Sequence, residues 1–178
     1  MNSSSKTQSS KQRGVTMIEA CITLAIASIL AGSALPSFKE SLDKRRVEGL
    51  SSEVGTDLRY ARSEAVARST GVRVSFHQGC YVVHTGSRAD CACDGQGPAV
   101  CTGDAVALKT VNSAEARGVQ VVANVSSLRF DPTNGTTSPT GTVCTVPANG
   151  RSVHHVVSLM GRVRTCAPAA AGAPCAPC

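Results

Sequence analysis

The most distinctive pattern along the chain is a mostly apolar run from Val15 to Leu35, in which Glu19 is the only charged residue. As a helix these 21 residues would extend about 31 Å, which is enough to cross a bilayer. Residues 1–14 precede the run with three basic residues and no acidic ones. Because basic flanks stay on the cytoplasmic side, the pattern predicts one membrane-spanning helix over residues 15–35 and export of the chain that follows.

A second periodic segment, residues 36–70, has apolar positions at intervals of three to five residues with charged residues between them. These apolar positions are Phe38, Leu42, Val47, Leu50, Val54, Leu58, Ala61 and Ala65. The spacing predicts an amphipathic helix with one buried face. The basic run Lys44-Arg45-Arg46 lies between two acids and is expected on the solvated face, and Ser69-Thr70-Gly71 is expected to end the helix.

From residue 71 the apolar positions recur every second residue, as in half-buried strands. Residues 72–77 and 81–84 flank a turn and predict a β-hairpin. Further short strands are expected at residues 119–125, 128–130, 143–146, 153–159 and 162–166, with loops at 86–103 and 131–141. The pattern therefore predicts an α+β fold, in which one long N-terminal helix, with its first half in the membrane, packs on a small antiparallel β-sheet head formed by residues 71–166. Residues 167–178, rich in Ala, Pro and Cys, are expected to form a tail without regular structure.

Length and composition indicate one folded domain that is exported. The chain has 178 residues, 42% of them apolar, with three Phe, two Tyr and no Trp, so Val, Ala and Leu must fill the core. It carries 18 Lys and Arg against 12 Asp and Glu. Its nine cysteines are typical of an oxidising compartment, which agrees with export.

Eight of the cysteines lie in the exported part and are disulfide candidates: Cys80, Cys91, Cys93, Cys101, Cys144, Cys166, Cys175 and Cys178. Cys21 lies in the expected membrane helix, where it would serve as a small apolar residue. The spacing leaves the full connectivity open. A bond between Cys144 and Cys166 is expected, because both lie at ends of C-terminal strands that a small antiparallel sheet would bring together.

The cysteines give only weak evidence for a redox site or a zinc site. Cys175-Ala-Pro-Cys178 looks like a redox pair, but it lacks the following helix that would lower a thiol pKa. Cys91, Cys93 and Cys101 with His84 have a spacing that zinc would tolerate, yet an oxidising compartment argues against a zinc site. No Ser/His/Asp arrangement, paired carboxylates or phosphate-binding loop stands out, so we expect a non-enzyme with neither a metal nor a cofactor.

The residues at the start of the apolar run carry a resemblance to a known signal. Gly14-Val15-Thr16-Met17-Ile18-Glu19, followed by an apolar stretch with Pro36 as the 22nd residue after Gly14, is similar to the cleavage and methylation signal of type IV prepilins. The resemblance implies that a membrane prepilin peptidase cuts after Gly14 and methylates Val15, which replaces the usual Phe, and that Glu19 guides assembly. The Glu19 carboxylate could pair with the new amine of Val15, or it could only reach the headgroups.

Three further patches resemble the GspH/FimT group, which contains minor pilins and the minor pseudopilins of type II secretion. They are residues 60–66, residues 128–130 with Asn134-Gly135, and residues 159–164. The similarity implies the type IV pilin fold. The Cys-rich loop and the Cys-Pro tail have no counterpart in this pattern.

The element Gly161-Arg162-Val163-Arg164 is the main candidate for binding. Arg162 and Arg164 are two residues apart on an expected strand, so both would project from one face. Guanidiniums suit phosphate oxygens, which they bind in a bidentate manner, and Gly161 would let a backbone or ligand come close. In the FimT branch, which this element resembles, a Gly-Arg-x-Arg motif binds DNA during natural transformation. The alternative is an ordinary edge strand with solvated arginines.

Arg151 is a weaker candidate for the same surface, and His154 and His155 could add charge at mildly acidic pH. The leading expectation is a minor type IV pilin, held in the inner membrane by one helix with its head in the periplasm. It would assemble with other pilin subunits into a cell-surface pilus and bind DNA without sequence preference. The alternative is a structural minor pilin or a GspH-like pseudopilin, in which Arg162 and Arg164 form subunit contacts. A third expectation, an adhesive subunit, would use the Cys-rich loop.

Overall fold

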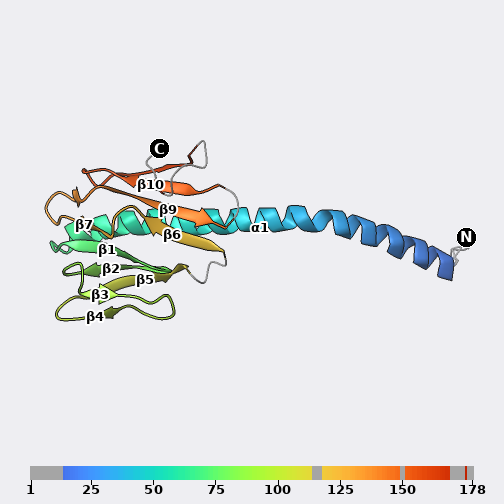
Figure 1. The fold of residues 1–178 in the computed structure, drawn as a ribbon, viewed down its shortest axis with the longest axis horizontal. Coiled ribbons are helices and arrows are strands. Elements are labelled where there is room, and N and C mark those ends of the chain that lie inside the picture. The colour runs from blue at the N-terminus through green and yellow to red at the C-terminus, as the bar shows by residue number, and fades with distance from the viewer. Residues whose placement is uncertain (1–13, 114–117, 149–150, 169–174, 176–178) are drawn as a thin grey trace, which may run out of the picture. The chain divides into compact units, whose positions relative to one another are not determined.

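The computed structural model describes residues 14–113, 118–148, 151–168 and 175 and is drawn in Figure 1. One helix, α1 (Met17–Ala67), covers 51 residues, so the two helical segments expected at 15–35 and 36–70 form one continuous element. The chain divides into two compact units, residues 1–41 and residues 42–178. The division falls within α1, so each unit contains a part of this helix.

In the first unit, α1 begins with a capped turn. The Thr16 hydroxyl accepts a hydrogen bond from the Glu19 backbone N–H at 3.3 Å, which satisfies one of the free donors at the helix start. Glu19 is the third helical residue, where the helix dipole favours a carboxylate. In the described part of the chain, no helix is both long and apolar enough to cross a membrane. This finding differs from the span expected over residues 15–35, where Glu19, Thr23 and Ser28 interrupt the apolar residues.

At its other end, α1 stops where the sequence places a boundary. The Thr70 N–H donates to the Ala65 carbonyl at 3.2 Å, and Ser69 takes a left-handed conformation with φ of 51°. This arrangement is the Schellman motif, which satisfies free carbonyls in the last turn of a helix. It turns the chain into the first strand at Val72.

The second unit contains two main sheets and a small third one, all antiparallel, rather than the single sheet expected from the sequence. The first sheet has the order β5 (Ala107–Asn112), β2 (Cys80–Thr85), β1 (Val72–His77), β7 (Ser127–Phe130) and β8 (Thr137–Ser138). The second has the order β11 (Val163–Cys166), β10 (Val153–Val157), β9 (Gly141–Pro147) and β6 (Val119–Ala123). The third pairs β3 (Cys91–Ala92) with β4 (Val100–Cys101).

Most of the expected strands are confirmed. The hairpin is formed by β1 and β2, which are joined by a turn in which Gly79 has φ of 79°. β6, β7, β9, β10 and β11 lie where strands are expected, within a few residues. Four of the described strands were not expected from the sequence: β3 and β4, which lie in the expected loop 86–103, β5, and β8, which lies in the expected loop 131–141. Most residues of β5 are partly exposed on both faces of this edge strand, so its sequence lacks a clear two-residue alternation.

The second half of α1 packs on both main sheets and shares one hydrophobic core with them (Figure 1). Val54, Leu58 and Ala61 of this half are at most 1% exposed. Their neighbours in the core are mainly valines of the two sheets, together with the buried rings of Tyr81 and Phe130. The core is therefore built from Val, Leu and Ala, as the composition predicts.

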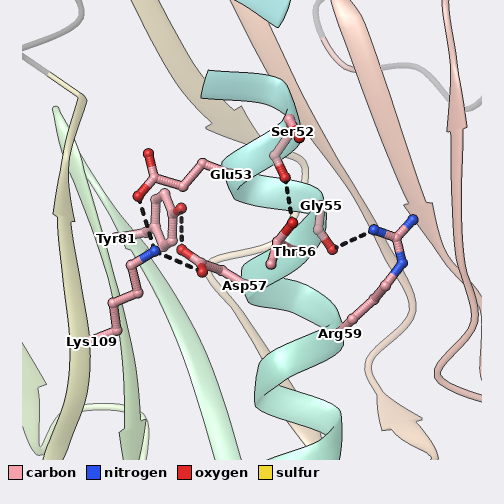
Figure 2. A network of polar contacts seen from close by, with 8 residues as sticks. All are labelled: Ser52, Glu53, Gly55, Thr56, Asp57, Arg59, Tyr81 and Lys109. Atoms are coloured by element: carbon pink, nitrogen blue, oxygen red, sulfur yellow. Dashed lines mark hydrogen bonds and ion pairs between the residues drawn. The ribbon is translucent and has the colours of Figure 1, made fainter. Parts of the chain in front are cut away.

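A polar network also joins α1 to the first sheet (Figure 2). Lys109 Nζ on β5 lies 2.8 Å from Asp57 Oδ1 and 2.9 Å from Glu53 Oε1 on α1, and the Tyr81 hydroxyl donates to Asp57 Oδ2 at 2.8 Å. Burial of the ring, and then the two carboxylates, raise the pKa of Tyr81. Both acids of this helical segment are thereby engaged on the side that faces the first sheet.

The disulfides differ from the expected pairing. The described bonds are Cys80–Cys93, Cys91–Cys101 and Cys144–Cys175. Cys166 is also disulfide-bonded, Cys178 lies outside the described residues, and Cys21 is free.

The expected bond between Cys144 and Cys166 is therefore wrong. Cys144 on β9 and Cys166 on β11 are both register partners of His154 on β10, so this strand separates them. Two strand spacings are about 10 Å, whereas the Cα atoms of a disulfide lie within about 7 Å of each other. Cys175 instead reaches the face of β9 from the tail, and its sulfur lies 3.3 Å from the Thr142 carbonyl oxygen.

Candidate nucleic-acid interface

A tight turn joins β10 to β11 and carries the first part of the Gly-Arg-Val-Arg element. The Gly161 N–H donates to the Ser158 carbonyl at 2.8 Å, and the Ser158 N–H donates to the Arg162 carbonyl at 3.0 Å. The Arg162 N–H is 3.3 Å from the Ser158 hydroxyl oxygen, which accepts from it. These bonds hold the backbone on both sides of Arg162.

Gly161 is a packing residue in this turn. Its φ of 67° is in the left-handed region, where glycine is favoured. A Cβ at this position would lie 2.1 Å from the Gly135 carbonyl oxygen and 3.0 Å from Arg62 Nε. Because Gly161 has no side chain, the backbone of the β7–β8 connection can approach it closely at Gly135.

Arg162 and Arg164 are both exposed but occupy different positions. β11 begins at Val163, so Arg162 belongs to the turn rather than to the strand. Val163 is the register partner of the buried Val157 and packs against the core. Arg164, one residue on, therefore lies on the outer face of the second sheet.

Arg162 lies beside two arginines of α1. A groove of about 460 Å³ is lined by Arg59, Arg62, Ser63, Val66, Gly161, Arg162 and Val163. Arg59 and Arg62 are one helical turn apart, so they share a face of α1. Neither was expected as a site residue from the sequence, although their spacing of three residues is visible in it. Their approach to Arg162, about 100 residues later, depends on how α1 packs against the turn.

The groove is rich in hydrogen-bond donors and poor in compensating acids. Arg59 donates from Nη1 to the Gly55 carbonyl at 3.2 Å, and Arg62 donates from Nε to the Gly135 carbonyl at 3.1 Å. Figure 2 shows Arg59 on the side of α1 opposite Lys109, which engages Glu53 and Asp57. Within residues 14–113, 118–148 and 151–168, no ion pair involves the three groove arginines or Arg164. The remaining guanidinium donors can therefore bind an anion.

His155, on the strand before this element, is buried rather than exposed beside the arginines. It is buried behind Arg59, with Nε2 3.0 Å from the Ser51 hydroxyl and Nδ1 3.1 Å from the Thr165 hydroxyl. Burial lowers its pKa, and the positive charge of Arg59 acts in the same direction. The surroundings of His155 therefore disfavour the charged form that was expected at mildly acidic pH.

The other expected site residues are not among the residues that line the groove. Arg151 is exposed and precedes β10, next to residues 149–150, which lie outside the described part of the chain. Gly14 and Val15 are exposed ahead of α1, in the first unit. Cys91 and Cys101 are bonded to each other and Cys93 to Cys80, so they supply no thiolates for the zinc site considered from the sequence.

Two sequence families match the chain. Residues 51–161 match the family described as type II transport protein GspH, and residues 9–35 match the prokaryotic N-terminal methylation motif. The second match covers the segment in which Gly14, Val15 and Glu19 resemble a prepilin signal. Among curated proteins, none has significant sequence similarity to the chain.

The fold is similar to that of solved pilin structures. A crystal structure of the type IV minor pilin FimU from Pseudomonas aeruginosa PAO1 gives a TM-score of 0.55 at 17% identity, over 71% of this chain and 95% of that chain. A second crystal form of FimU gives 0.52 at 17% identity, over 69% and 98%. The minor pseudopilin EpsH from the type 2 secretion system of Vibrio cholerae gives 0.47 at 14% identity, over 70% and 99%. The FimU structures confirm the predicted type IV pilin fold.

Proposed function

The chain belongs to the GspH family and is a minor type IV pilin or pseudopilin, and from this premise we propose that it is a pilin whose head binds DNA. Binding would serve DNA uptake in natural transformation. The observation that supports the proposal is the groove in which Arg162 meets Arg59 and Arg62. Phosphate oxygens can accept bidentate hydrogen bonds from such guanidiniums, and the backbone is the same in every DNA sequence.

The proposed mode of binding is electrostatic and independent of sequence. The chain has no Trp and only five Phe and Tyr residues, three Phe and two Tyr, so base stacking is a poor source of affinity. Arg164 on the outer face of β11 would extend the contact beyond the groove, and Arg151 would add long-range attraction. Affinity should then fall steeply with salt, because each phosphate contact releases condensed counterions.

We also propose that the chain is processed and located as a pilin. A prepilin peptidase would cut after Gly14 and methylate Val15, and residues 15–35 would anchor the subunit in the inner membrane, with the head in the periplasm before assembly into a surface pilus. Mass spectrometry of the assembled protein should find Val15 at the N-terminus with a methylated amine. A mature chain that begins at Met1 would contradict this processing.

Loss of the two motif arginines should weaken DNA binding without unfolding the head. We expect Arg162→Ala/Arg164→Ala to lose affinity for duplexes of unrelated sequence by similar factors. The slope of log affinity against log salt should become shallower by about 0.9 for each lost phosphate contact. The measurement is a mobility-shift titration of the full chain in a non-ionic detergent at several salt concentrations.

Two further variants make the test specific. Lys44→Ala/Arg45→Ala removes the same number of charges from an exposed part of α1 and should keep most of the affinity. Arg162→Lys/Arg164→Lys keeps the charge but loses bidentate geometry, so binding retained by it would indicate a diffuse basic surface. If the folded Ala pair binds DNA as tightly as the parent, DNA binding by this element is refuted.

A structural role is the second candidate. Leu159 and Met160, in the same turn as Arg162, are 60% and 64% exposed. Exposed apolar side chains beside arginines are typical of subunit contacts, so this turn would pack against a neighbouring pilin or pseudopilin. In that case the Ala pair should reduce incorporation into fibres while leaving DNA binding unchanged.

A further inference from the structure

Two arginines and a histidine lie on the outer face of the first sheet, across three neighbouring strands. Arg73 on β1 is the register partner of Arg129 on β7 and of His84 on β2. The side chains of register partners share one face of a sheet. His84, Arg73 and Arg129 therefore form one row, separate from the groove that contains Arg162.

The two arginines of this row are held by neutral contacts. Arg73 donates from Nη1 to the Ser127 hydroxyl at 2.9 Å, while its buried Nε has no hydrogen-bond partner among the described residues. Arg129 packs beside Gly71, where a Cβ would lie 2.8 Å from Arg129 Nη2. Like charges on directly opposed residues of neighbouring strands destabilise a sheet, and an anion bound between them would relieve this repulsion.

The protein supplies little negative charge to this row. Burial lowers the pKa of Arg73, and the charges of Arg129 and Arg88 lower it further. Asp90 is the one acid that acts against them, and its Oδ2 already accepts the Ser87 N–H at 2.6 Å. Across the described part of the chain, the ion pairs include none to Arg73, Arg88 or Arg129.

His84 contributes no charge to the row. Its Nδ1 lies 2.8 Å from the Thr85 carbonyl, which can only accept, so Nδ1 carries the proton. Its Nε2 then accepts from the Ser75 hydroxyl at 2.8 Å. Burial lowers the pKa of His84, which keeps the ring neutral beside Arg73.

We propose that Arg73 and Arg129 form an oxyanion site that binds a phosphate group. A tetrahedral phosphate presents several acceptor oxygens, so it can bridge two guanidiniums and relieve their repulsion. Asp90 would remain on its loop, because its carboxylate is engaged there. The site takes one phosphate and is distinct from the Gly-Arg-Val-Arg element.

The phosphate could be a free anion or part of a DNA backbone. The β7–β8 hairpin carries Arg129 on its first strand and Gly135 in its turn, and Gly135 contacts Arg62 and would clash with a side chain on Gly161. The same hairpin therefore contributes to both the groove and the row, so a DNA backbone is the second phosphate source to test. Binding of free phosphate does not rest on the proposed DNA-binding function.

The test uses the full chain in a non-ionic detergent and follows thermal unfolding with increasing inorganic phosphate, against chloride at equal ionic strength. We expect the parent midpoint to rise saturably with phosphate, because a ligand that binds the folded state stabilises it. Arg129→Gln should weaken the apparent phosphate affinity about tenfold, as expected for loss of one strong charged contact. Arg45→Gln removes the same charge elsewhere and should match the parent.

Two outcomes would overturn the site: no phosphate-specific rise in the parent, or a full rise in Arg129→Gln. Without phosphate, Arg129→Gln should be at least as stable as the parent, since it removes a like-charge contact. A separate DNA titration distinguishes free phosphate from a DNA backbone. If the site binds DNA phosphates, Arg129→Gln should make the slope of log affinity against log salt shallower; if it binds only free phosphate, the slope should not change. If the parent binds phosphate but not DNA, the proposed function fails while this site stands.

Discussion

Replacement of Gly161 by alanine should destabilise the head by about 3 to 5 kcal/mol. The new Cβ would meet the Gly135 carbonyl oxygen at 2.1 Å, and the backbone would also be strained at a φ of 67°. The neighbour is backbone rather than a flexible side chain, so the turn or the β7–β8 connection must shift. Urea unfolding of the full chain in detergent measures the loss as a lower midpoint.

Gly103→Ala is the matched control. Gly103 has a nearly identical φ of 64°, but nothing lies within 4 Å of its Cβ position. It should therefore show the conformational cost alone, about 1 kcal/mol. If Gly161→Ala costs no more than Gly103→Ala, the close approach to Gly135 is contradicted, and Gly161 would instead be available for contact with a ligand.

Removal of the Cys144–Cys175 disulfide should have the second largest effect. The bond joins residues 31 positions apart, and its loss should lower the free energy of unfolding by about 3.7 kcal/mol, because the denatured chain gains conformational freedom. Cys144→Ala/Cys175→Ala avoids an unpaired thiol that could exchange with Cys166. We expect a lower urea midpoint and faster proteolysis of the tail in the double variant.

Cys91→Ala/Cys101→Ala provides the comparison for this prediction. This bond closes a shorter loop, with a separation of 10, and should contribute about 2.7 kcal/mol. Peptide mapping under non-reducing conditions gives an independent check, because it should recover Cys144 joined to Cys175. A peptide that joins Cys144 to Cys166 would contradict the observed topology.

The groove illustrates how a motif and a site differ. The Gly-Arg-Val-Arg element could be selected from the sequence because its residues are adjacent and resemble a known pattern. The sequence suggested that Gly161 admits a backbone or ligand, and the structure assigns that approach to Gly135. It also suggested that both arginines share one strand face, whereas Arg162 lies in the turn before β11 and lines a groove with α1.

The sequence by itself determined the features that depend on neighbouring residues. The helix over residues 17–67, the hairpin of β1 and β2, and the Val-rich core follow from local periodicity and composition. The signal around Gly14 is a linear motif, so it needs no fold to be recognised. Each of these features depends on residues that are only a few positions apart. Their periodicity alone decides which side chains of a helix or strand are buried and which are exposed to water.

Only the tertiary structure decided which distant residues meet. The strand order places β10 between Cys144 and Cys166, which rules out the pairing expected from strand ends. The packing of α1 brings Arg59 to Arg162, and the β1–β7 register sets Arg73 opposite Arg129. These contacts join segments whose separations along the chain exceed any local period. They are selected by how one shared core is filled, which no single segment of the sequence specifies.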